Sequence, residues 1–139
     1  MADIVVTAAQ VKRVYAENDV VRDYIVGTAV TAGVPVYVVT STGKIAPADG
    51  SAASTAQVRG VALRDGAAGE VVPVLRRGIV AGFTLAGDFD SRVYLSDTVG
   101  TLGDSAGTVS VIVGRVVRSL DSSATKLLDV DVNLLTQYS

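Results

Sequence analysis

Apolar residues in this chain come in short runs separated by Gly, Asp, Ser and Thr. Short Val-rich runs are typical of β-strands, because the branched Cβ of Val packs well on a pleated surface. Successive side chains of a strand point to opposite faces, so an alternating segment turns one face to the core and the other to water. The pattern predicts an all-β fold, a small single-domain β-barrel or jelly-roll-like sandwich. The clearest alternation sets Leu128, Val130, Val132 and Leu134 against Asp129, Asp131 and Asn133.

One unit of this pattern occurs twice. The stretch 36–75 contains a Val-Tyr strand, a Gly-Lys turn, a loop of small residues and two further strands. The stretch 93–132 repeats this order, with Val93-Tyr94 matching Val36-Tyr37 and Gly114 matching Gly60. Such self-similarity predicts an internal pseudo-repeat with copies at 33–75 and 90–132.

Two local features of the first copy lead to further predictions. The segment 46–56 is small and polar and lacks periodicity, so we expect an exposed loop there. Pro73 lies in the strand 71–75. Since proline cannot donate to a central ladder, it predicts an edge strand or a bulge.

The ends of the chain are expected to differ from the β domain, which spans 20–135. The segment 1–19 contains the apolar cluster Ile4-Val5-Val6 and fits a strand and a short helix about equally well. We interpret it as a strand of the domain's own sheet or as an arm that docks on a neighbouring subunit. Residues 136–139 form a short polar tail, in which Tyr138 is a candidate contact.

Composition narrows the classes of partner. The net charge is −2, from 12 basic and 14 acidic residues, and no block of like charge stands out. This argues against nucleic acid, whose phosphates need clustered Lys and Arg, and against an anionic membrane surface. No apolar run approaches the roughly 20 residues of a membrane-spanning helix.

The residues available for catalysis are few. The sequence has no His and no Cys, which excludes a Ser-His-Asp triad, a Cys nucleophile and the usual zinc sites. The Thr42-Gly43-Lys44 turn lacks the first Gly and the final Ser or Thr of a phosphate-binding loop. Two carboxylate pairs could serve glycoside hydrolysis: Asp88 with Asp90, and Asp129 with Asp131. Both occur where a solvated face or a turn would place acids anyway, and that is the favoured interpretation. Asp97 and Asp104 lie in loops with oxygen ligands for calcium but in no recognised calcium motif. We therefore expect no enzyme, no metal and no cofactor.

The first copy of the repeat resembles the head-decoration, or capsid cement, proteins of tailed bacteriophages. The resemblance covers about residues 25–135 and lies in the succession of Ala32-Gly33-Val34-Pro35-Val36-Tyr37, the Gly43-Lys44 turn, Val58-Arg59-Gly60-Val61-Ala62-Leu63, Ala67-Ala68-Gly69-Glu70 and Val71-Val72-Pro73-Val74. It implies a small β-barrel protein, dimeric or trimeric, that binds the outside of an icosahedral head and bridges major capsid subunits. The protein would then reside on the outer capsid surface of the virion, and in the host cytoplasm before assembly.

The candidate contacts for such an association are the terminal segments and the strand-end arginines, namely Ile4, Val5, Arg13, Arg76, Arg77 and Tyr138. For the adjacent pair Arg76-Arg77, a solvated turn is the simpler interpretation and an ion-pairing contact with an acidic partner the more specific one. Two other functions remain open. One is a β-sandwich binding module of a virion, either carbohydrate-binding or fibre-associated, and the other is a hydrolase using paired Asp residues.

Overall fold

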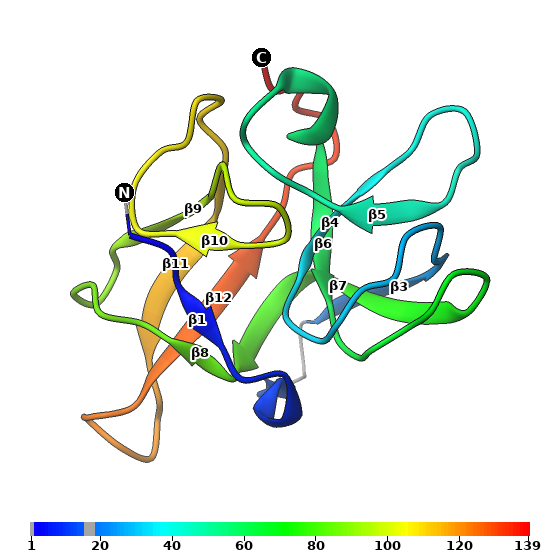
Figure 1. The fold of residues 1–139 in the computed structure, drawn as a ribbon. Helices are drawn as coiled ribbons and strands as arrows, with labels where there is room; N and C mark the ends of the chain where they lie inside the picture. The colour runs from blue at the N-terminus through cyan, green and yellow to red at the C-terminus, as the bar shows by residue number, and fades with distance from the viewer. Residues whose placement is uncertain (1, 16–18) are drawn as a thin grey trace.

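The structure is a computed structural model that describes residues 2–15 and 19–139. It confirms the all-β prediction: a ten-stranded antiparallel sheet curls into a half-barrel, and two further strands form a small second sheet (Figure 1). The described residues also include two short 3-10 helices. The strands are β1 (Val5–Val6), β2 (Lys12–Val14), β3 (Val20–Ile25), β4 (Pro35–Val38), β5 (Ile45–Pro47), β6 (Val58–Ala62), β7 (Val71–Ala81), β8 (Phe83–Thr84), β9 (Arg92–Leu95), β10 (Leu102–Gly103), β11 (Ile112–Arg118) and β12 (Lys126–Asp131). The helices are η1 (Ala8–Gln10) and η3 (Ala53–Thr55).

The order of strands in the main sheet gives the sequence repeat a structural counterpart. That order is β10-β9-β11-β12-β7-β6-β4-β5. In the first copy β4 pairs with both β5 and β6, and β6 pairs with β7. In the second copy β9 pairs with both β10 and β11, and β11 pairs with β12. The two copies therefore have the same pairing scheme, and they meet at the antiparallel β12–β7 pair.

The matching glycines Gly60 and Gly114 lie at matching irregularities. The β4–β6 register shifts beside Gly60, and the β11–β9 register shifts beside Gly114. A Cβ on Gly60 would lie 2.5 Å from the Leu75 carbonyl oxygen, and one on Gly114 would overlap the Asp129 carbonyl oxygen. Each glycine thus lets the backbone of the next strand of its own copy approach closely. The two copies therefore share a bulge at the same position, and this bulge bends each half of the sheet.

The long strand β7 holds the two halves together. Its first part pairs with β3 on one edge and β6 on the other, and its last part pairs with β2 and β12. The prediction of an edge strand or bulge from Pro73 is therefore wrong for the strand as a whole. Pro73 faces the point where β6 ends: the Leu63 amide still donates to the Pro73 carbonyl, at 3.0 Å, so only the reciprocal bond is missing.

The segment 46–56 is the exposed loop that its composition predicts only at residues 51–54. It begins in β5, and Ala48, Asp49, Gly50 and Ala56 are buried. The Gly50 amide donates to Ser96, and the Gly50 carbonyl accepts from Val109, both at 2.8 Å. Small residues are used here because the first copy inserts its backbone into the second, and larger side chains would not fit.

The N-terminal segment pairs with strands of its own chain. The Ile4 amide donates to Leu102 in β10 at 2.8 Å, β1 pairs with β8, and β2 pairs with β7. Ile4 and Val6 also pack on the core, whereas Val5 is 65% exposed. Within the described residues 2–15, β2 joins the main sheet and β1 belongs to the small second sheet, and docking of the segment on a neighbouring subunit stays a prediction.

Two clusters of buried side chains pack against the sheet and form the hydrophobic core. The larger one lies between the two copies and includes Leu75, Val80, Leu95, Leu128 and Val130. The smaller one, which includes Val26, Val36, Ile45, Val72 and Val74, lies beneath β3, β4 and β5. The alternation in β12 is confirmed, since Leu128 and Val130 are fully buried while Asp131 is exposed. Among the described residues, no helix is long and apolar enough to span a membrane.

Candidate partner-binding groove

Several of the acidic residues that could have served catalysis or metal binding are engaged by the chain itself, whereas Asp88 is exposed. Asp90 lies 3.7 Å from Arg115, and Asp131 lies 3.3 Å from Arg77. Asp97 accepts hydrogen bonds from the amide and hydroxyl of Thr108 at 2.8 and 2.7 Å, and Asp104 accepts one from the Ala2 amide at 3.0 Å. In the ranges 2–15 and 19–139, no three acidic side chains come together in a way that could hold a metal ion.

Asp129 is the acidic residue whose titration is perturbed along the β12 face. Burial raises the pKa of its carboxyl, and the negative charge of Asp131 raises it further. Arg115 lies opposite Asp129 in the β11–β12 register. Asp129 and Asp131 line an open hollow of about 540 Å³ together with Asp19. Two of these three carboxylates are engaged by arginines of the chain, Asp19 by Arg13 and Asp131 by Arg77.

The predicted contact residues do not form one surface. Arg13 pairs with Asp19 at 3.4 Å, and Arg77 pairs with Asp131. The Arg76 side chain donates to the Val132 carbonyl at 3.4 Å. Ile4 and Val5 lie at β1, and Tyr138 is half-buried near Gln57. Arg76 and Arg77 lie in a hollow that shares Leu134 with a larger groove, described next.

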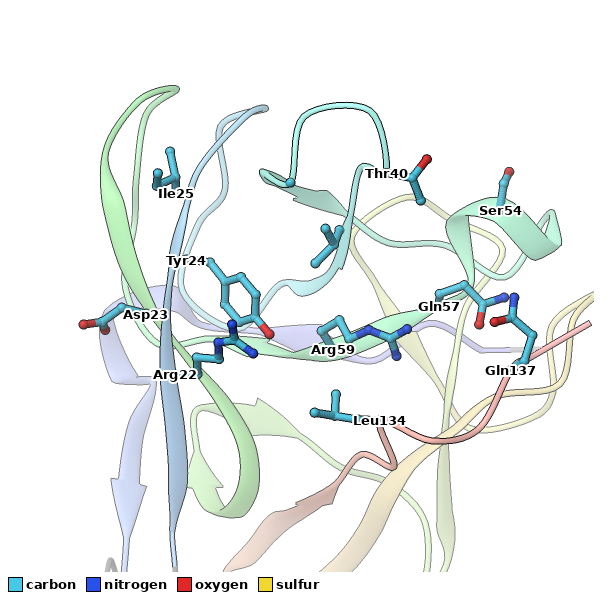
Figure 2. Close-up of a pocket in the computed structure, with 12 residues that line it drawn as sticks. Arg22, Asp23, Tyr24, Ile25, Thr40, Ser54, Gln57, Arg59, Leu134 and Gln137 are labelled. Carbon is cyan, nitrogen blue, oxygen red and sulfur yellow. The ribbon is translucent and has the colours of Figure 1, made fainter.

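This larger groove is open, has a volume of about 720 Å³, and is bounded by β3, the β4–β5 hairpin, β6 and the C-terminal segment (Figure 2). Its polar side chains come from three separate parts of the chain. Arg22 and Tyr24 extend from β3, Gln57 and Arg59 from the start of β6, and Gln137 from the tail. We call it the arginine groove. Its remaining lining residues are Asp23, Ile25, Val38, Thr40, Gly43, Ser54 and Leu134.

The alternation of side chains along β3 determines which of them point into the arginine groove. Arg22 and Tyr24 share one face of the strand, and in Figure 2 both extend into the groove while the Asp23 carboxylate points away. The Arg22 guanidinium lies over the Tyr24 ring, 5.2 Å from its centroid. This cation–π contact orients the long Arg22 side chain and covers one face of the ring.

The opposite wall is fixed by Gln57. Its side-chain amide donates to the carbonyls of Tyr138 and Ala53 at 2.6 and 2.7 Å, and its carbonyl accepts from the Tyr138 amide at 3.0 Å. These bonds join β6, η3 and the C-terminal tail. Arg59 follows two residues later on the same wall, half-buried, with a 3.3 Å bond to the Val58 carbonyl.

The groove is electropositive. Within the described ranges, neither Arg22 nor Arg59 has a carboxylate within the 4.0 Å of an ion pair, in contrast to Arg13, Arg77 and Arg115. The field of Arg59 reaches Tyr138: burial raises the pKa of the Tyr138 hydroxyl, and the positive charge of Arg59 opposes that rise. The groove can therefore bind an anionic group, but it offers no nucleophile paired with a base and no ligand set for a metal.

Sequence reasoning missed Arg22, Arg59 and Gln57, because they are far apart in the chain and none belongs to a motif. A signal was present in β3, where Arg22 and Tyr24 alternate with Asp23 and Ile25. That alternation separates a cationic, aromatic face from an acidic, apolar one. Tyr138, a predicted partner contact, lies beside this groove, and its backbone bonds to Gln57. Its role as a partner contact stays a prediction.

Comparison with known proteins does not assign the chain to a family. No protein-family model matches the chain, and a search of curated proteins finds none with significant sequence similarity.

Proposed function

We propose that the protein is a structural decoration protein that binds the outer surface of an icosahedral phage head and stabilises contacts between major capsid subunits. The proposal is supported by the resemblance of residues 25–135 to capsid cement proteins. It is supported equally by a β framework built from two interlocked copies of one unit. The observation that carries it is the arginine groove, an open recognition surface whose two guanidiniums lack carboxylate partners among the described residues.

The mechanism is association. Each protein molecule buries a modest interface on the shell. Many molecules bound at symmetric positions add their contributions, so the particle gains stability even where one contact is weak. Rigidity suits this role, because a preformed surface loses little conformational entropy on binding. The Gly50 backbone, bonded to Ser96 and Val109, joins the two halves of the protein.

The test uses purified protein and expanded phage shells that lack a decoration protein. The proposal predicts saturable binding to the outer surface and a higher rupture temperature of the loaded shells. A control with shells already saturated by the protein should show no further uptake. If the protein neither binds nor shifts the rupture temperature, the proposal is wrong; if a glycan array instead yields a reproducible sugar ligand, the carbohydrate-binding alternative replaces it.

A further inference from the structure

We propose that the arginine groove binds an extended acidic segment of another protein, with Arg22 and Arg59 each holding a carboxylate. The inference rests on the proposed function, because it gives the chemistry of the shell surface that the protein would contact. It also makes a claim about the isolated protein that does not require a shell.

The charges of the lining carry the first step. A guanidinium presents a planar fork of N–H donors that matches a carboxylate, and its attraction to an anion is strongest where water is partly excluded. Arg59 is half-buried, and no carboxylate of the described residues neutralises it or Arg22. Asp23, the one acidic residue in the lining, points away from the groove in Figure 2. The groove therefore has two cationic positions available to a partner.

The placement of the two arginines favours an extended ligand over a small ion. Arg22 extends from β3 beside Tyr24, whereas Arg59 extends from β6 in the direction of Gln57 and Gln137, so the two guanidiniums lie at separate points along the groove (Figure 2). A volume of about 720 Å³ is also far larger than one phosphate. The apolar side chains of Val38 and Leu134 line the same groove and suit an apolar residue between two acidic ones.

Two features favour a protein segment over single-stranded nucleic acid. Nucleic-acid grooves combine several cations with aromatic rings on which bases stack. Here the Arg22 guanidinium already covers one face of Tyr24, the only ring in the lining. The net charge of the protein is −2, so a long polyanion gains no attraction from the molecule as a whole. Attraction is therefore local, as expected for a short acidic peptide.

The test measures binding of fluorescently labelled poly-L-glutamate to the whole protein at low ionic strength. We expect saturable binding that weakens as salt is added. The double variant Arg22→Gln and Arg59→Gln should bind about tenfold more weakly or worse, because it loses two charge-assisted contacts. The matched control is Arg92→Gln with Arg118→Gln, which removes the same charge from two exposed arginines outside the groove lining and should keep binding close to that of the wild type. Urea unfolding midpoints establish that both double variants are folded.

Three outcomes would overturn the inference: no binding of poly-L-glutamate by the folded wild type, equal losses in the two double variants, or tighter binding of inorganic phosphate or of an oligothymidylate than of poly-L-glutamate. Nuclear magnetic resonance gives an independent readout, since the Gln57 side-chain amide and the Arg22 and Arg59 Nε resonances should shift on binding. Shell binding without poly-L-glutamate binding would refute the assignment of the arginine groove as an acidic-peptide site and leave the proposed function standing. Poly-L-glutamate binding without shell binding would support that assignment and refute the proposed function.

Discussion

Adding one methyl group at either bulge glycine should disrupt the strand pairing of its copy. At Gly60, with a φ of 151°, an alanine Cβ would lie 2.5 Å from the Leu75 carbonyl oxygen and 2.7 Å from a Val74 methyl carbon. Backbone strain of about 1–3 kcal/mol and overpacking of about 1–3 kcal/mol combine to a loss of about 2–6 kcal/mol for Gly60→Ala. That is a large part of the roughly 5–15 kcal/mol that stabilises a domain.

Two further alanine variants separate the causes. Gly114 has no positive φ, so Gly114→Ala introduces only the overlap with the Asp129 backbone and should cost about 2–3 kcal/mol. Gly69 has a φ of 91° with open space around its Cβ position, so Gly69→Ala introduces only backbone strain, about 1–2 kcal/mol.

Urea unfolding followed by circular dichroism provides the measurement. With a slope of about 2 kcal/mol per molar urea, the loss expected for Gly60→Ala lowers the midpoint by about 1–3 M. The expected order of destabilisation is Gly60→Ala, then Gly114→Ala, then Gly69→Ala. If both bulge variants were no less stable than Gly69→Ala, the close approach of the strands at the two bulges would be refuted.

Three other predictions concern the core, the β12 face and the N-terminal segment. Leu128→Ala, at a fully buried position, should lower the free energy of unfolding by about 2–5 kcal/mol, whereas Leu135→Ala, at a position 95% exposed, should leave it nearly unchanged in the same urea assay. Because the pKa of Asp129 is raised in the folded state, its contribution to stability is present at acid pH and is lost as pH rises through that pKa. Asp129→Asn should therefore flatten this decline between pH 3 and 7, and a variant that keeps the full decline would contradict the assignment. Hydrogen bonds from the hydroxyls of Ser96 and Thr98 lower the pKa of Asp3, so the contribution of Asp3 to stability is lost as pH falls. Asp3→Asn should therefore speed hydrogen exchange of the Ile4 amide at neutral pH. Unchanged exchange would show that Asp3 does not hold the N-terminal segment in place.

The sequence was sufficient for the framework, because the framework follows from local rules. Alternation at 128–134 identifies the two faces of β12, and the match of Val36-Tyr37 to Val93-Tyr94 identifies two strands, β4 and β9, that occupy the same place in their copies. The prediction from Pro73 failed because a proline is tolerated in a strand paired on both edges when its missing donor faces the end of a neighbouring strand. That geometry depends on where β6 stops, which is not a local property.

The arginine groove could not be assembled from sequence for a similar reason. Arg22, Arg59 and Gln137 meet only because β3 and β6 pair with the same part of β7 and because Gln57 ties down the tail. In the segment 46–56, by contrast, sequence reasoning predicted exposure for residues that are partly buried. Its small polar composition is typical of surface loops, yet the same small size lets its backbone fit between the two copies, with Gly50 bonded to both Ser96 and Val109.

The central claim is that this protein acts by binding a phage shell, and cosedimentation with expanded shells tests it most directly. The shells should come from tailed phages and lack a decoration protein. We expect saturable binding at a fixed ratio to capsid subunits, weakened in the Arg22→Gln and Arg59→Gln variant and retained in the Arg92→Gln and Arg118→Gln control. Folded wild-type protein that stays in the supernatant at every shell concentration would contradict the account.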